Sequence, residues 1–155
     1  MKHLTSWKIF ENGGSGNASF NWLIKQKNQN YFKLEEILEM DLFDKYDIKP
    51  KDEEFFFDAE DGGDWPNYKF WTYRVKNSSS ILEDTANFGK IGEGKEIEFI
   101  IIYNIVWDIH DELVKDLENI KERVKSYTGK DLVYGAEEID SSPGFILYDF
   151  ILKLQ

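Results

Sequence analysis

Seven carboxylates and no base lie between Asp52 and Asp64, in a stretch that also contains three phenylalanines and is followed by Trp65 and Tyr68. Carboxylates grouped with aromatic residues suit three kinds of site: oxygen coordination of a metal ion, acid catalysis on a sugar, and recognition of a basic protein. The plain alternative is a solvated surface, because a run of like charges is most often simply exposed.

The residue order argues against metal and cofactor sites. Counting from Asp58 as a calcium-binding loop, Gly63 falls at the turn position, but Lys69 stands where the bidentate Glu is required. The chain has no cysteine for a thiolate site. The glycine-rich stretch 13–19 has Ser19 at the third glycine of a dinucleotide motif and a predicted strand after it, and 89–96 lacks the Ser/Thr of a phosphate loop. We expect no metal and no cofactor.

Candidate catalytic residues are few. His110 lies between Asp108 and Glu112, but a spacing of two residues on a helix turns these side chains apart, and helix capping explains them better. A carboxylate pair beside Trp65 and Trp71 would suit a small-ligand or carbohydrate-binding domain or a hydrolase, which we keep as the alternative function. We find no catalytic motif and assign no catalytic residue, so the sequence favours a non-enzymatic role and leaves the question open.

The acidity of the chain is concentrated in one segment. The net charge is −11, and residues 33–64 hold thirteen acids against four bases, a net charge of −9. Such a charge repels phosphates, so we expect no nucleic-acid binding and no anionic membrane surface as a partner. The N-terminus has no apolar signal region, and no apolar run approaches the roughly 18 residues of a membrane span. We expect a cytoplasmic protein.

Hydrophobic patterns predict a single α+β domain over residues 1–155, with a mostly antiparallel sheet and two main helices packed on it. The helices are expected at 33–46 and from Asp108 to the glycine cap at Gly129, with a short helix possible near 80–87. The predicted strands are 4–11, 18–26, 53–59, 68–76, 96–107, 132–134 and 145–154, with loops at 12–17, 60–67 and 135–143.

Asp41 interrupts the apolar face of the first predicted helix, which Leu34, Leu38 and Leu42 share. Two explanations are open: the helix breaks near Met40, or the carboxylate is partly buried and paired.

The acidic stretch is expected to form a hairpin that a basic protein can recognise, because a concentrated charge steers such a partner and aromatic residues anchor it. A solvated surface remains the other interpretation. The candidate partner-binding residues are Glu53, Glu54, Asp58, Glu60, Asp61, Asp64, Trp65 and Tyr68.

In general character, the chain resembles the immunity proteins of bacterial toxin systems. The resemblance rests on the acidic segment 33–64, on Trp65 and Tyr68, and on the lack of catalytic motifs. It implies a small cytoplasmic inhibitor that binds a basic toxin such as a nuclease. No family motif matches, so no residue takes a role from the resemblance. The identity of the partner and the oligomeric state stay open.

Overall fold

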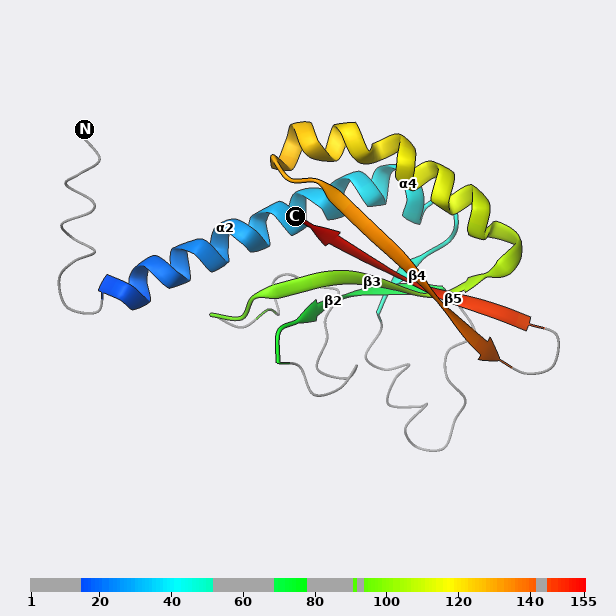
Figure 1. Cartoon of the computed structure of the whole chain (residues 1–155), viewed down its shortest axis with the longest axis horizontal. Coiled ribbons are helices and arrows are strands. Elements are labelled where there is room, and N and C mark those ends of the chain that lie inside the picture. Colours follow the sequence, from blue (N-terminus) through cyan, green and yellow to red (C-terminus); the bar gives the residue numbers. More distant parts are fainter. Residues whose placement is uncertain (1–14, 52–68, 78–90, 92–93, 142–144) are drawn as a thin grey trace.

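The computed structural model of the chain describes residues 15–51, 69–77, 91, 94–141 and 145–155. Two helices, α2 (Ser15–Leu38) and α4 (Trp107–Thr128), lie on the same side of a five-stranded sheet, and the π-helical turn η1 (Glu39–Phe43) continues α2 (Figure 1). The strands are β1 (Lys49–Pro50), β2 (Phe70–Val75), β3 (Ile97–Val106), β4 (Leu132–Ser141) and β5 (Phe145–Leu154).

The sheet has the strand order β1-β2-β3-β5-β4. β1 runs parallel to β2, and every other neighbouring pair is antiparallel. The prediction of an α+β fold with a mostly antiparallel sheet and two main helices packed on it is therefore confirmed. β1 has two residues and β4 has ten, so the two margins of the sheet differ greatly in length.

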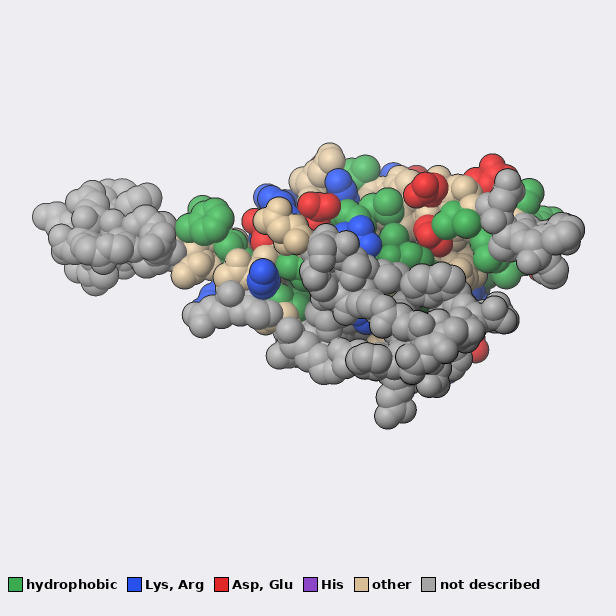
Figure 2. All heavy atoms as spheres, turned by 90° about the horizontal axis from the view of Figure 1, so that it is seen from below, with side chains coloured by type: hydrophobic (Ala, Val, Ile, Leu, Met, Phe, Trp, Pro, Cys, Tyr) green, Lys and Arg blue, Asp and Glu red, His purple; other side chains and the backbone are tan. Residues whose placement is uncertain are grey.

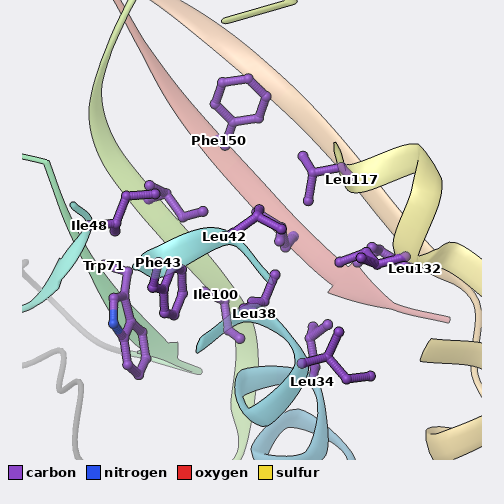
Figure 3. Close-up of a cluster of buried hydrophobic side chains, with 14 of the residues drawn as sticks. Leu34, Leu38, Leu42, Phe43, Ile48, Trp71, Ile100, Leu117, Leu132 and Phe150 are labelled. Atoms are coloured by element: carbon purple, nitrogen blue, oxygen red, sulfur yellow. The ribbon is translucent and has the colours of Figure 1, made fainter. Parts of the chain in front are cut away.

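The core lies between the helices and the sheet, and Figure 3 shows side chains from all of these elements converging there. Leu34, Leu38 and Leu42 of α2 and η1 belong to one buried cluster with Ile100 of β3, and Leu117 of α4 lies over β5. The rings of Phe43 and Trp71 stack with centroids 5.2 Å apart. β3 is buried on both faces from Phe99 to Ile102, as its unbroken apolar run predicts.

The N-terminal half of α2 contradicts the predicted strand at 18–26, and Ser15–Asn17 begins this helix instead of forming part of a loop. The apparent alternation of Phe20, Trp22 and Ile24 is misleading, because Phe20 and Trp22 are exposed. The helical period was hidden by a polar residue at a core-facing position, Asn28, which is buried one turn after Ile24. Strand 4–11 and residues 12–14 lie outside the described residues.

Polar side chains of α2 complete the ends of two strands, which is why the helix can bury them. The Asn28 amide donates to the Lys95 carbonyl at 2.9 Å, and its oxygen accepts from the Ile97 backbone N–H at 2.9 Å. The Tyr31 hydroxyl donates to the Glu98 carbonyl and accepts from the Leu154 backbone N–H. These bonds satisfy backbone groups where β3 begins and β5 ends, so burying the two side chains carries little desolvation cost.

Of the two explanations offered for Asp41, the pairing holds, and near Met40 the helix changes its winding without breaking. The α-helix ends at Leu38, and the wider turn Glu39–Phe43 brings both Leu42 and Phe43 into the core. Asp41 is then only partly exposed and forms an ion pair with Arg123 of α4. The predicted helix 33–46 is thus the end of a longer helix that changes its winding at the charged residue.

We expect Arg123→Met to lower the free energy of unfolding by about 1 kcal/mol, since it leaves a half-buried carboxylate without its cation. Lys125→Met is the matched control, because Lys125 pairs with Asp131 at 3.3 Å between two exposed side chains. Urea denaturation of both variants checks this. Equal losses in the two variants would show that the Asp41 pair is worth no more than a surface one.

α4 matches its prediction closely. It begins at Trp107, so Asp108 lies in the first turn and is not the cap residue. Gly129 ends it with φ 75° and donates its N–H to the Lys125 carbonyl at 2.9 Å. Tyr127, although it follows Val124 at the helical spacing, is exposed. The buried stripe is Leu113, Leu117, Ile120 and Val124.

The C-terminal third corrects one prediction. Residues 135–141 belong to strand β4, which pairs with β5 along its whole length, where a loop was expected. The loop prediction rested on the polar run from Asp140 to Pro143. Glu137 and Glu138, earlier in the same stretch, also interrupt any apolar alternation. They are tolerated because this part of the strand is exposed at the margin of the sheet. Strands 68–76, 96–107 and 145–154 are observed with small changes of bounds, whereas 53–59 and 80–87 lie outside the described residues.

Candidate partner-binding surface

All eight predicted partner-binding residues, Glu53 to Tyr68, lie in 52–68, outside the described residues, so the predicted hairpin stays a prediction. The structure does fix where this segment joins the fold. Lys51 donates its backbone N–H to the Trp71 carbonyl at 3.0 Å, and Lys49 donates to the Lys69 carbonyl at 3.1 Å. The acidic stretch therefore leaves and re-enters the fold at the β1 margin of the sheet.

Several described acids of residues 33–64 form ion pairs or hydrogen bonds with other residues of the chain. Asp41 pairs with Arg123, and Glu36 accepts a hydrogen bond at 2.7 Å from the Tyr127 hydroxyl. Asp47 pairs with Lys49 at 3.2 Å on the surface. The first two contacts tie η1 and α2 to α4, and the third is a local pair between a turn and β1. The net charge counted from the sequence thus overstates the unpaired negative charge that the described part of this segment presents to a partner.

Glu35 is a described acid whose pKa is strongly raised. It is partly buried and accepts a hydrogen bond from the Tyr73 hydroxyl. Burial, followed by the hydrogen bond with Glu39, raises the pKa of Glu35 to about 7. Burial raises the pKa of Tyr73 well above its usual value, so its hydroxyl stays protonated and acts as the donor. The Glu35 carboxyl can therefore hold a proton near neutral pH.

This pair of carboxyls does not provide the aromatic wall that a sugar site needs. Tyr73 and Trp71 beside it are buried in the core, where their rings meet edge to face at 5.2 Å. Stacking on a sugar requires an exposed ring face. The Glu35 and Glu39 pair is therefore better explained as part of the contact between α2 and β2.

A second carboxyl of raised pKa lies on the face of the sheet opposite the helices. Asp149 of β5 is buried and accepts from the Asn104 backbone N–H at 3.3 Å. Burial raises the pKa of Asp149 to about 6, with a further contribution from Glu137, which lies directly opposite on β4. Asn104 sits in the register shift between Ile102 and Ile105 with φ 67°. This bulge directs its N–H to the carboxylate.

Within the part of the chain that the structure describes, neither carboxyl belongs to a metal-binding cluster. Among the residues that the structure describes, no three His, Asp or Glu side chains gather closely enough to hold a metal ion. His110 packs on the ring of Tyr148 with centroids 4.3 Å apart and contacts Asp111 at 3.0 Å. Residues 15–19 of the glycine-rich stretch belong to helix α2 and no strand follows them, yet Ser19 still occupies the third glycine position of a dinucleotide motif.

The N-terminal part of α2 carries exposed apolar residues and basic residues. α2 extends beyond the sheet (Figure 1), and hydrophobic side chains gather on this extension in the view from below (Figure 2). Phe20, Trp22 and Leu23 are each more than half exposed. The stretch 15–34 holds three lysines and no acid, so it differs in charge from the rest of the chain.

The β4 margin is the other exposed surface that the sequence missed. Val133 and Ile139 are exposed apolar residues there, and Glu137 and Glu138 are exposed acids. In the sequence, this part of the strand is indicated only by the β-branched residues Val133 and Ile139 on either side of the two glutamates. A strand that is exposed on both faces shows no alternation of apolar and polar residues.

Comparison of the chain with protein-family models, with curated proteins and with solved structures found no match. Among the described residues, no helix has the length and apolar character that crossing a bilayer requires.

Proposed function

We propose that the chain is a non-enzymatic binding protein that neutralises a basic protein partner, as an immunity protein inhibits a bacterial toxin such as a nuclease. The observation that supports this most directly is the concentration of a net charge of −9 in residues 33–64. Charge gathered in one segment attracts a basic partner over distance, and aromatic side chains such as Trp65 and Tyr68 then anchor it. The proposed place of action is the cytoplasm.

The structure of the described residues is compatible with this use of the segment. The described residues on either side of the acidic stretch are hydrogen bonded to each other at β1 and β2, so its two ends are fixed on the sheet. Of its described acids, Glu36, Glu39, Asp44 and Asp47 are exposed. A hydrolase or carbohydrate-binding role has less support, because the described rings beside the Glu35 and Glu39 pair, Trp71 and Tyr73, are buried.

Charge reversal in the segment tests the proposal. Wild type and the triple variant Glu60→Lys, Asp61→Lys, Asp64→Lys would be immobilised and exposed to a lysate of the source cells at low and high salt. Proteins retained by wild type would then be identified and purified. We expect a basic protein whose association with the variant is slower by about tenfold or more and depends less on salt.

The matched control is Asp111→Lys, Glu122→Lys, Asp131→Lys, which changes the net charge equally on α4 and the turn after it, where all three side chains are exposed. It separates a local effect of the segment from a general effect of net charge. The purified partner's own activity must also be inhibited at a one-to-one ratio. A partner that binds both triple variants as it binds wild type would remove the acidic stretch from the function.

A further inference from the structure

Among the described strands, β4 is a long one at the margin of the sheet. It has ten residues, all paired with β5 on one side, and the strand order places it last. In an antiparallel ladder, alternate residues direct their backbone N–H and C=O groups away from the neighbour. The stretch 135–139 is exposed throughout, and a Cβ built on Gly135 would meet nothing within 4 Å. These outward backbone groups are therefore accessible.

The opposite margin is protected in the usual ways and β4 is not. β1 is only two residues long and consists of a lysine and a proline, Lys49 and Pro50. Short length, lysine and proline each discourage a further strand from pairing. β4 has none of these features, and its exposed apolar side chains Val133 and Ile139 add contact surface. An extended segment of another chain can thus continue the sheet at β4.

The charges on β4 select the kind of segment. Between Leu132 and Ser141 there are three acids and no base. Two copies of β4 paired with each other would bring Glu137 and Glu138 close to like charges, which destabilises cross-strand pairs. A lysine or arginine opposite these glutamates would instead form favourable pairs. A second copy of this chain is therefore disfavoured as the occupant, and a basic strand is favoured.

The side chains of β4 alternate between the two faces of the sheet, and this alternation determines the sequence that a pairing strand needs. Val133, Glu137 and Ile139 lie on the face away from the helices, and Glu138 lies on the helix face. The complementary strand has basic residues at two adjacent positions, opposite Glu137 and Glu138. It has apolar residues opposite Val133 and Ile139.

We propose that β4 is a strand-addition site for an extended basic segment of a partner protein. Backbone hydrogen bonds to β4 provide the affinity, and the glutamate and apolar positions provide the selectivity. The site is separate from residues 52–68, and the proposal stands whether or not the acidic stretch binds a toxin.

The test uses the full chain and a synthetic peptide blocked at both ends. The peptide carries valine opposite Val133 and Ile139, lysine opposite Glu137 and Glu138, and threonine elsewhere. A second peptide is N-methylated at the amides that would face β4, which keeps its charge and removes its backbone bonds. Titrations followed by amide hydrogen exchange give both the affinity and the location of binding.

We expect the first peptide to bind at least about tenfold more tightly than the N-methylated one, and to slow exchange at alternate amides of β4. In the variant Glu137→Lys, Glu138→Lys, preference should reverse toward a peptide with glutamate in place of lysine. This variant alters only exposed side chains, and circular dichroism confirms its fold.

Three results would overturn the proposal. Equal binding of the two peptides would reduce the contact to charge alone. Protection at amides outside β4 would place the peptide elsewhere. Protection of β4 that grows with protein concentration without any peptide, together with a dimer in ultracentrifugation, would make a second copy the occupant. Binding by the Glu60, Asp61 and Asp64 reversal variant is expected to be unchanged, so this proposal and the proposed function can fail independently.

Discussion

Leu117→Ala is expected to lower the free energy of unfolding by about 3 kcal/mol, more than the other single substitutions proposed for this chain. Leu117 is fully buried in the middle of the α4 stripe and lies over β5, beside the core leucines of α2 and η1 (Figure 3). Truncation removes the transfer free energy of the side chain and leaves a cavity. The helix and the strand are each fixed by other contacts and cannot fully close it.

The matched control is the same substitution at an exposed site. Leu23 lies in the extension of α2 and is 58% exposed, so Leu23→Ala should change the free energy of unfolding by less than about 0.5 kcal/mol. Urea denaturation at one protein concentration gives both values. A large loss for Leu23→Ala would mean that this apolar end is covered in solution, and repeating the measurement at several concentrations would show whether another copy covers it.

The second large effect is on the pH dependence of stability. In the folded chain, burial raises the pKa of Glu35 from 4.5 to about 7 and that of Asp149 from 3.8 to about 6. A folded state with raised carboxyl pKa values binds protons more tightly than the unfolded chain does. The stability that these groups contribute is therefore fully present below their unfolded pKa values. It is lost as pH rises through their folded pKa values. For these two groups the loss spans about pH 4 to 7.

We expect the double variant Glu35→Gln, Asp149→Asn to remove most of this slope and to be more stable than wild type near pH 8, by about 1–2 kcal/mol per site after allowing for solvent screening. Both substitutions keep an oxygen that accepts the existing bond, from the Tyr73 hydroxyl and from the Asn104 N–H. The measurement is the free energy of unfolding in urea across the pH range.

Glu122→Gln is the control for this experiment, since it removes one negative charge from an exposed position on α4. It should leave the slope nearly unchanged. If the slope survives in the double variant, general repulsion in a chain of net charge −11 governs the pH dependence, and the two buried carboxyls do not.

The fold changes how the acidic segment is understood. Counted along the chain, residues 33–64 form one block of charge. In the structure, Glu35 and Asp41 are partly buried. Glu35 contacts Tyr73 and so joins α2 to the sheet, and Asp41 contacts Arg123 and so joins η1 to α4. The proposed interaction with a basic partner therefore depends mostly on the later part of the segment, which leaves the sheet after Lys51.

The sequence alone determined α4, the central strand β3 and the last strand β5, because each carries its signal locally. In α4 the apolar residues from Leu113 to Val124 recur at the helical spacing and Gly129 supplies the cap. In β3 four consecutive residues are buried, which only a central strand allows. It also indicated that Asp41 needed either a break or a partner, since an isolated carboxylate cannot lie on an apolar face.

Only the tertiary structure decided the N-terminal half of α2, the length of β4 and the uses of the acids, because these depend on partners distant in the sequence. Asn28 and Tyr31 are core-facing only because β3 and β5 supply bonds to them. Residues 135–141 are a strand only because β5 lies beside them, since their exposed side chains have no burial pattern of their own. Asp41 finds its cation on Arg123, 82 residues later in the chain (123 − 41), and that contact exists only once α2 and α4 share one face of the sheet.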